Sequence, residues 1–351
     1  MRLSFTALLA CVVLLVPLTA QDQHFSQFYA APLSLNPALT GTFDGRFRVS
    51  AIYRDQWSKV LDHPYRTFAT SLDLRWPLGK RLSTANDAFA VGVQFFSDKA
   101  GTVDFSTTQI AISGAFHKVL DLAKTQFLSL GFQGGIAQRN INYENVTFED
   151  QFDGVNGYVD PTAENLPENN FAFGDLSVGL NYTYSAPSRL ALFAGFAVHH
   201  ILEPSVSFYS RGDEVDNFPS DKLHRKYSAQ LSLRLPLADK VHILPRAIYS
   251  NQGPHTKFDA GANFRFVVND LNGIALHLGG YLRQTNSVTD GFGPSEFVTL
   301  LGLEYSNVLF GLSYDFNLDD LANTRQGQRT FELSVAYLGN YEDEIVLCPK
   351  F

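Results

Sequence analysis

The sequence predicts an all-β protein: a closed transmembrane antiparallel β-barrel of about 14 strands, with the N- and C-termini in the periplasm. Three observations predict this fold. Segments of alternating apolar and polar residues recur along most of the chain. Their connections alternate between shorter and longer ones. After residue 20, no apolar run approaches the roughly 20 residues that a spanning helix needs, so only a closed barrel could satisfy the backbone hydrogen bonds within a membrane.

The composition suits a barrel with an apolar outer face and a polar interior. The 351 residues include 30 Phe and 15 Tyr, while the mean hydropathy is close to neutral at -0.06. Lipid-facing and lumen-facing residues average out in such a barrel, which explains many aromatic residues at low mean hydropathy. The formal net charge is -8 without a basic block, and this argues against nucleic acid as a partner.

Residues 1–20 have the features of a secretory signal peptide. Arg2 gives a positive start, residues 8–18 are apolar, and Leu18-Thr19-Ala20 offers an exit for cleavage after Ala20. Residues 8–11 faintly resemble a lipoprotein cleavage site at Cys11, but the apolar run continues past this cysteine. The mature chain would keep only Cys348, which excludes an internal disulfide and leaves a free or partner-linked thiol.

Residues 21–45 are not strand-like and form a separate N-terminal segment, which we assign to the periplasmic side. Within it, Asn36 as a helix cap, Pro37 at the first helical position and Gly41 beyond the end predict a single short helical turn. We expect the segment either in the periplasm or tucked into the near mouth of the barrel. An ordered leader and a functional element are both open interpretations.

Residues 46–338 are expected to form the barrel. The clearest strand is 227–235, where apolar residues from Tyr227 to Leu235 alternate with polar ones that include Arg234. Segment 241–249 contains Pro245, which a central strand of a soluble sheet would seldom accept. The predicted strands are 46–53, 67–76, 88–96, 105–116, 126–139, 174–185, 189–199, 227–235, 241–249, 258–267, 273–283, 296–305, 308–316 and 330–338.

The connections provide an independent test of the barrel and of its orientation. The shorter set is 77–87, 117–125, 186–188, 236–240, 268–272 and 306–307. The alternate set is mostly longer and comprises 54–66, 97–104, 140–173, 200–226, 284–295 and 317–329, with 251–256 as an exception. Outer-membrane barrels have short periplasmic turns and longer extracellular loops. The alternation therefore predicts that both termini, including the tail 339–351, are periplasmic.

Two groups of residues could hold a metal ion but do not have the expected pattern. His199 and His200 are adjacent at a strand end, where neighbouring side chains face opposite sides, so a rim or aromatic-belt role is favoured over a shared metal. The loop 149–160 is acidic and Gly-rich, which suits calcium chemically. Its spacing does not match a calcium-loop motif, so a solvated loop is favoured.

The strand pattern directs several charged residues into the lumen. A structural ion-pair network and a selectivity filter are both open interpretations of this set. No catalytic triad, paired carboxylates, metal-ligand spacing or phosphate loop stands out, so we predict a non-enzymatic protein without a cofactor. The inward-pointing charges are Asp73, Arg75, Arg234, Asp259, Arg265, Asp315 and Glu332.

Several segments together resemble the PorP/SprF family. They are residues 25–29 (FSQFY), 36–41 (NPALTG) and 53–57 (YRDQW) near the start, 199–204 (HHILEP) in the middle, and 348–351 (CPKF) at the end. Two features depart from the family pattern: Glu203, and Lys350 where Arg is more common. The resemblance covers essentially the whole mature chain, and its opening motif is the most specific part.

The resemblance implies an outer-membrane barrel of the type IX secretion system in a Gram-negative bacterium. It also implies partners: outer-membrane lipid, a secreted adhesin-type surface protein with a C-terminal sorting domain, and periplasmic ring or lipoprotein components. Loops 140–173 and 200–226 would then face outward, where cargo would dock. Candidate partner-binding residues, for which turn-forming and barrel-closing roles are the alternative, are Phe25, Gln27, Asn36, Pro37, Arg54, Gln56, Trp57 and Cys348.

The favoured functional hypothesis is a non-enzymatic anchor or adaptor in type IX secretion and gliding. It would anchor or help to export a surface protein and couple it to periplasmic components. The alternative is a passive channel or hydrophobic-substrate transporter, since barrels of this size can enclose a lumen. A third hypothesis is a surface lipid hydrolase that uses His199 or His200.

Overall fold

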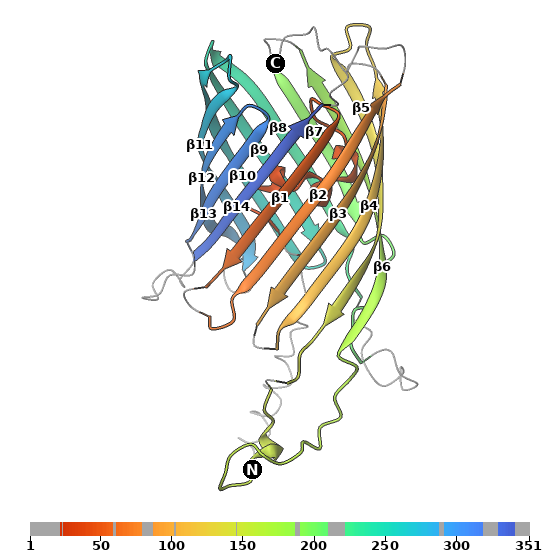
Figure 1. Cartoon of the computed structure of the whole chain (residues 1–351), viewed down its shortest axis with the longest axis vertical. Coiled ribbons are helices and arrows are strands. Elements are labelled where there is room, and N and C mark those ends of the chain that lie inside the picture. Colours follow the sequence, from red (N-terminus) through yellow and green to blue (C-terminus); the bar gives the residue numbers. More distant parts are fainter. Residues whose placement is uncertain are drawn as a thin grey trace.

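A computed structural model describes residues 22, 24–58, 61–78, 87–101, 103–144, 146–186, 190–209, 222–287, 291–318 and 329–340. Within these residues, one antiparallel sheet of fourteen strands closes on itself because β1 pairs with β14 (Figure 1). The predicted barrel and its number of strands are confirmed. The predicted signal peptide with Cys11, and residues 341–351 with Cys348, lie outside the described residues.

Each predicted strand is present, and most continue beyond the predicted ends because backbone pairing extends past the amphipathic pattern. The strands are strongly tilted relative to the barrel axis (Figure 1), as closure requires. They are β1 (Phe47–Gln56), β2 (Tyr65–Pro77), β3 (Ala88–Ala100), β4 (Phe105–Val119), β5 (Gln126–Asn140), β6 (Asn170–Ser185), β7 (Ala191–His199), β8 (Lys226–Ala238), β9 (Val241–Gln252), β10 (His255–Asn269), β11 (Ile274–Ser287), β12 (Gly291–Tyr305), β13 (Val308–Asn317) and β14 (Arg329–Gly339).

The outer face of the barrel is apolar. On β4 and β5 the outward side chains Ile112, Phe132 and Ile136 are exposed by 60%, 59% and 66%, whereas the inward Ser113 and Ser129 are buried. A continuous apolar band of this kind would be unfavourable in water and suits contact with lipid. In the described part of the chain, no helix has the length and apolar character required to cross a bilayer.

The two ends of the barrel differ in their connections. One end, called here the short-turn end, has the connections 78–87, 120–125, 186–190, 239–240, 270–273 and 306–307. The other, called the loop end, has 57–64, 101–104, 141–169, 200–225, 253–254, 288–290 and 318–328. The two longest connections are therefore at the same end, as predicted. Connections 97–104 and 284–295 are shorter than expected because β3, β11 and β12 extend into them.

The N-terminal residues run through the barrel rather than beside it. Phe47 pairs with Gly339 at the short-turn end, so both ends of the wall lie there, whereas the prediction placed residues 21–45 on that side as well. Asp22, however, contacts Lys226 and Gln252 at the loop end. The described residues 22 and 24–45, called here the luminal segment, thus cross the lumen from one end to the other. The first described residue and the end of β14 are therefore on opposite sides.

The luminal segment contains three short helical turns, visible as red-brown coils inside the barrel (Figure 1). They are η1 (Phe28–Ala30), α2 (Pro32–Leu35) and η2 (Pro37–Leu39). The predicted turn is η2: the Asn36 side chain accepts a hydrogen bond from the Ala38 N–H, and Pro37 occupies the first position. The other two turns were not indicated by the sequence pattern.

Three of the seven predicted inward charges, Asp259, Asp315 and Glu332, belong to one structural network. Most of its ion pairs involve Arg54 or Arg283. Arg54 lies 2.5 Å from Glu332 and 3.5 Å from Asp315, while Arg283 pairs with Asp259, Glu296 and Asp315.

The remaining predicted charges divide into paired and unpaired groups. Asp73 pairs with Arg48, Arg265 pairs with Glu304, and Arg75 donates to the carbonyl of Phe43. Arg234 alone has no hydrogen-bond or ion-pair partner among the described residues. The network interpretation therefore fits every predicted charge except Arg234.

We predict that Arg54→Met destabilises the barrel by about 3–5 kcal/mol, because it leaves the buried Glu332 and Asp315 carboxylates without a cation. Denaturant unfolding of the purified protein in detergent measures this change. Arg66→Met is the matched control, since Arg66 is 59% exposed and lies 3.6 Å from Asp55. It should cost less than about 1 kcal/mol. Equal effects of the two substitutions would contradict a dominant role of the interior network.

Candidate functional site

The first half of the luminal segment is bound to β14 and β13 through buried polar groups. The backbone N–H groups of Ser26 and Gln27 both donate to the Glu332 carboxylate, at 2.7 and 2.9 Å. The fully buried Gln27 side chain donates to Ser313 and accepts from Ser334. A carboxylate that accepts several backbone donors is strongly held. This part of the segment is therefore an integral part of the interior.

The Ser26 hydroxyl connects the luminal segment to the charged network. It donates to Asp315 over 2.5 Å and accepts from Arg54 and Arg283 at 3.1 and 2.8 Å. Next to it, Phe25 is buried in an apolar cluster with Ile52. The segment therefore adds hydrogen bonds to charged groups that already pair with one another across the strands.

Apolar contacts hold the middle of the segment against the opposite wall. Phe28 is buried in a cluster with Ile248, Tyr281 and Val298 from β9, β11 and β12. Its ring meets that of Tyr281 edge to face, with 5.9 Å between the centroids. This geometry is favourable for aromatic pairs. The segment thus contacts walls on both sides of the lumen.

Asn36 fixes the second half of the segment to β6 and β7. Its side chain is fully buried and donates from Nδ2 to the carbonyls of Leu180, at 3.1 Å, and Phe196, at 3.4 Å. Its Oδ1 accepts from the Ala38 N–H at 2.9 Å. One side chain thus caps the helical turn and ties it to the wall.

Three glycines make room for this turn. A Cβ atom at Gly179 would lie 1.9 Å from Asn36 Oδ1, and one at Gly195 would lie 2.8 Å from Asn36 Nδ2. At Gly131, the Cβ atom would lie 2.3 Å from the Ala38 nitrogen. All three distances are shorter than any normal contact. Glycine is therefore required here for close approach of the backbone. We call these residues the glycine recess.

The last part of the segment is bound to β2 and β4. The Thr40 hydroxyl bonds to Ser113 at 2.9 Å, and the Thr40 carbonyl lies 2.8 Å from His117 Nε2. The Gly41 N–H donates to Asp73 at 2.7 Å. Because these contacts lie toward the short-turn end, the segment is fixed along its whole length.

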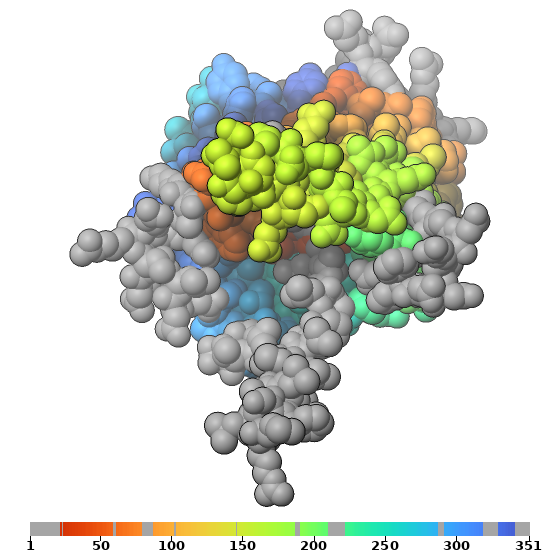
Figure 2. Space-filling model, turned by 90° about the horizontal axis from the view of Figure 1, so that it is seen from below, coloured from red at the N-terminus to blue at the C-terminus, as the bar shows by residue number. Residues whose placement is uncertain are grey.

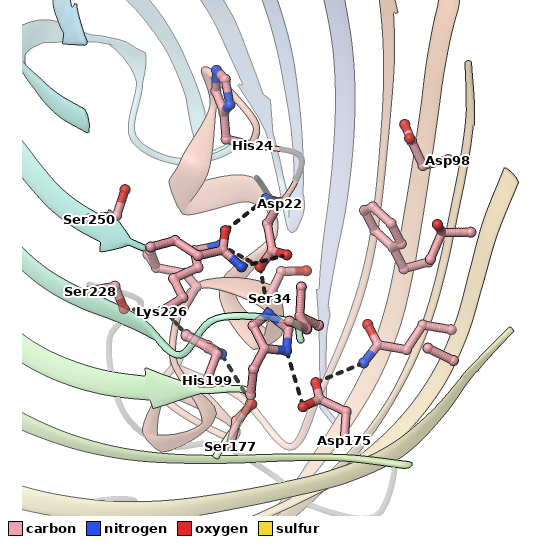
Figure 3. Close-up of a pocket in the computed structure, with 18 of the residues that line it drawn as sticks. Asp22, His24, Ser34, Asp98, Asp175, Ser177, His199, Lys226, Ser228 and Ser250 are labelled. Atoms are coloured by element: carbon pink, nitrogen blue, oxygen red, sulfur yellow. Dashed lines mark hydrogen bonds and ion pairs between the residues drawn. The ribbon is translucent and has the colours of Figure 1, made fainter. Parts of the chain in front are cut away.

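A cavity of about 220 Å³ remains between the luminal segment and the inner wall in the loop-end half. Asp22, Asp175, His199 and Lys226 converge on one side of it, while Asp98 lies across it (Figure 3). Aromatic side chains complete the lining: Phe25, Phe28, Phe96, Phe105 and Phe173.

The connection 141–169 extends beyond the ends of β5 and β6 near this half (Figure 1). Figure 2, seen from the loop end, shows the yellow-green chain in front of part of the mouth. Asp153 in this connection accepts from the N–H groups of Val155, Asn156 and Gly157. The described residues of the protein contain no group of three or more potential metal ligands. Hydrogen bonds within the loop therefore fix the turn at Asp153.

His200 holds the beginning of the luminal segment. Its Nε2 lies 2.7 Å from Asp22 Oδ2 and its Nδ1 lies 3.1 Å from Asp175 Oδ1, while Lys226 lies 3.2 Å from Asp22. Burial of the ring favours its neutral form, but the carboxylates of Asp22 and Asp175 outweigh burial and raise the pKa of His200 to about 9. His200 is therefore charged at neutral pH and forms an ion-pair latch with Asp22.

The expectation that His199 and His200 face opposite sides was wrong. His199 is the last residue of β7 and points inward, with Nδ1 3.2 Å from Ser177 and Nε2 3.3 Å from the Leu35 carbonyl. His200 follows the strand with a φ of 57°, so the chain turns and its ring also enters the lumen. The alternation of strands no longer applies at this position. Both rings are bound to the luminal segment rather than placed in an outer aromatic belt.

The structure buries five of the predicted site residues inside the barrel, Phe25, Gln27 and Arg54 near β1 and β14, and Asn36 and Pro37 near β5, β6 and β7. Gln56 ends β1 and accepts from Arg54 at 3.3 Å. Trp57 follows it at the loop end and packs edge to face on Tyr65, 5.4 Å between centroids. Partner binding by these residues stays a prediction, as does any role of Cys348.

Sequence reasoning missed the Asp22 latch and the glycine recess. Glycines inside predicted strands 126–139, 174–185 and 189–199 were a usable signal, because they often mark close backbone approach.

Comparisons with known proteins give one family and a shared fold. A family model described as "Type IX secretion system membrane protein PorP/SprF" matches residues 18–337. A mutant of the TodX monoaromatic hydrocarbon channel is similar over 89% of this chain and 94% of its own, at 13% identity and a TM-score of 0.50. A FadL homologue from Pseudomonas aeruginosa is similar over 86% of this chain and 92% of its own, at 12% identity and a TM-score of 0.49. No curated protein matches the chain.

We predict that Gly179→Ala loosens the luminal segment at a cost of about 1–3 kcal/mol, because the added methyl group displaces the buried Asn36. Hydrogen exchange of residues 24–45 should become faster, and denaturant unfolding should occur earlier. Gly174→Ala on the same strand is the control, since nothing lies within 4 Å of its added Cβ. If both variants exchange like the parent protein, the recess does not hold the segment.

The His200 latch should weaken at alkaline pH. A pKa of about 9 against an ordinary 6.5 corresponds to about 3 kcal/mol. Because the folded-state pKa is raised, this stabilisation is complete below pH 6.5 and is lost as the pH rises through 9. Hydrogen exchange at residues 24–30, corrected for its intrinsic pH dependence, should increase across this range. His200→Gln should abolish the transition, and a transition that persists in this variant would contradict the latch.

Proposed function

The chain belongs to the PorP/SprF family of type IX secretion system membrane proteins, and we propose that it anchors or helps to export a surface protein. In this proposal the barrel is a non-enzymatic part of the secretion and gliding machinery in the outer membrane. It couples its cargo, an adhesin-type protein with a C-terminal sorting domain, to periplasmic ring or lipoprotein components. The family match over residues 18–337 is the observation that carries the proposal.

The occupied interior supports an adaptor rather than an open pore. The luminal segment is tied to β14 by Gln27, to β6 and β7 by Asn36, and to β2 by Gly41. These contacts are buried and polar, so their loss would leave unsatisfied groups inside the wall. A barrel fixed in this way is suited to present its two ends to different partners.

The two ends provide different surfaces for such partners. The longest connections, 141–169 and 200–225, share the loop end, which we assign to the cell exterior and to cargo docking. The short-turn end and the tail 339–351 would then meet periplasmic components. The apolar outer face would contact outer-membrane lipid.

A channel or transporter for hydrophobic substrates is the second candidate. The cavity near the loop end, lined by Phe25, Phe28 and Phe96 among others, favours it. One structural neighbour is a monoaromatic hydrocarbon channel, but at 13% identity the likeness shows the fold alone. Uptake of an aromatic hydrocarbon by reconstituted vesicles, absent without the barrel, would favour this candidate over the adaptor.

The adaptor proposal predicts which surface retains cargo. Replacement of residues 143–168 by a short Gly-Ser turn should leave a folded barrel, because Asn142 and Asn169 at the base of the loop are kept. Cargo recovered with the tagged barrel from detergent-solubilised envelopes should fall several-fold, as measured by mass spectrometry. A similar replacement of residues 319–328, at the same end, is the control. Equal recovery from the 143–168 variant and the parent would exclude this loop as the docking surface.

A further inference from the structure

The inner wall carries an excess of positive charge near the short-turn end of β8, β9 and β10. Arg234, Arg246 and Arg265 contribute one arginine from each of these neighbouring strands. The register places Arg246 opposite Ser232 and Arg265 opposite His242. Arg234 follows Ser232 by two residues, so the three arginines lie in successive inward-facing rows of the same wall.

Contacts on the same strands show that these side chains face the lumen. The Arg246 guanidinium lies 3.9 Å from the ring centroid of Tyr29 in the luminal segment. Arg265 pairs with Glu304 across the inner face. On β8, the Ser228 hydroxyl bonds to the Leu35 carbonyl of the luminal segment, and Arg234 lies on the same face by alternation.

The described residues leave this charge largely uncompensated. Glu304 is the carboxylate of this region, and it already accepts from Arg265 and from His277, at 2.6 and 2.7 Å. Arg246 forms a cation–π contact and a 3.4 Å hydrogen bond to Tyr281, but no ion pair in the described part of the chain. Arg234 has neither a hydrogen bond nor an ion pair within residues 22–340 as described. Like charges held close together repel when no anion is present.

The surface is also open to solvent. Ser232, Arg234, His242 and Arg246 all face inward, yet each is only half-buried, whereas Ser228, Ile248 and Ser250, nearer the loop end of β8 and β9, are buried. The helical turn η2 packs on β4, β5, β6 and β7 instead. A ligand that enters from the short-turn end can therefore reach the arginines.

We propose that Arg234, together with Arg246, forms an anion site that binds carboxylate or phosphate groups from the short-turn end. A guanidinium presents parallel N–H donors that match two oxygens of such a group. Bound anion would neutralise the excess charge of the three arginines. The site does not depend on the proposed function, because it rests on the inner wall alone.

Two sources could supply the anionic group. A free anion is one source. The chain itself is the other, since Glu342, Asp343 and Glu344 follow β14, which ends at the short-turn end. Both sources offer oxygen pairs of the same chemistry. Phosphate titration with and without residues 341–351 distinguishes them.

Phosphate titration of the purified full-length barrel tests the site. Thermal unfolding is followed by circular dichroism while sodium phosphate replaces sodium chloride at constant ionic strength. We expect a saturable rise in Tm with phosphate. Arg234→Gln should weaken the apparent affinity about tenfold or more, because it removes a charge-assisted contact. Arg234→Lys should lie in between, since it keeps the charge but loses the planar fork.

Two readouts separate binding from a purely structural role. Without phosphate and in the barrel that lacks residues 341–351, Arg234→Gln should be at least as stable as the matching barrel with Arg234, because it relieves repulsion from Arg246 and Arg265. Arg66→Gln, on the exposed outer face, should keep the full phosphate response. The absence of a saturable response in both the parent protein and the barrel that lacks residues 341–351 would overturn the proposal, as would a response that Arg234→Gln leaves unchanged in both.

Removal of residues 341–351 identifies the source of the anion. If the tail occupies the site, its removal should increase the apparent phosphate affinity severalfold, and this gain should be absent in an Arg234→Gln background. If the site takes a free anion, removal of the tail should leave the affinity unchanged while Arg234→Gln still weakens it. A gain in affinity that persists in the Arg234→Gln background would overturn the assignment to Arg234.

Discussion

The pairing of β1 with β14 is the constraint on which the rest of the structure depends. Ten residues of each strand pair in continuous register from Phe47–Gly339 to Gln56–Thr330, so the sheet has no free edge. Within lipid, a free edge would leave backbone groups without partners. Closure encloses a lumen lined by the polar half of each strand, and those side chains must then find partners inside. The ion pairs of Arg54 and Arg283 and the path of the luminal segment are consequences of this requirement.

The luminal segment completes the interior in three chemically different ways. Near the loop end, Asp22 is held by the charges of His200 and Lys226. In the middle, Ser26 and Gln27 satisfy the carboxylate of Glu332. Toward the short-turn end, the glycine recess admits Asn36 and the turn that follows it. The Asp22 contacts depend on pH, the Glu332 contacts depend on charge balance, and the glycine recess depends on shape. Different stimuli would therefore release different parts of the segment.

Much of the fold could be predicted because each strand has its own alternation of apolar and polar residues. Every strand was identified, including β9 with Pro245, since alternation and turn length depend only on neighbouring residues. The path of residues 22–45 was not predictable, because its partners are more than 70 residues away in most contacts, as between Thr40 and Ser113. His200 was misplaced because one residue with positive φ reverses the direction that strand alternation implies. The inward direction of Arg234 followed from the pattern, but its lack of a partner depends on which side chains surround it.

The long sequence separation of these contacts affects the order in which the protein assembles. The hydrogen bond between Gln27 and Glu332 spans 305 residues, so the ribosome must finish almost the whole chain before it can form. Formation of such distant contacts is slow because the intervening chain must first be ordered. The segment that is synthesised and exported first is therefore among the last to become fixed. Until β14 is in place, the luminal segment lacks its hydrogen bonds to Glu332, and a chain truncated before that strand would lack them permanently.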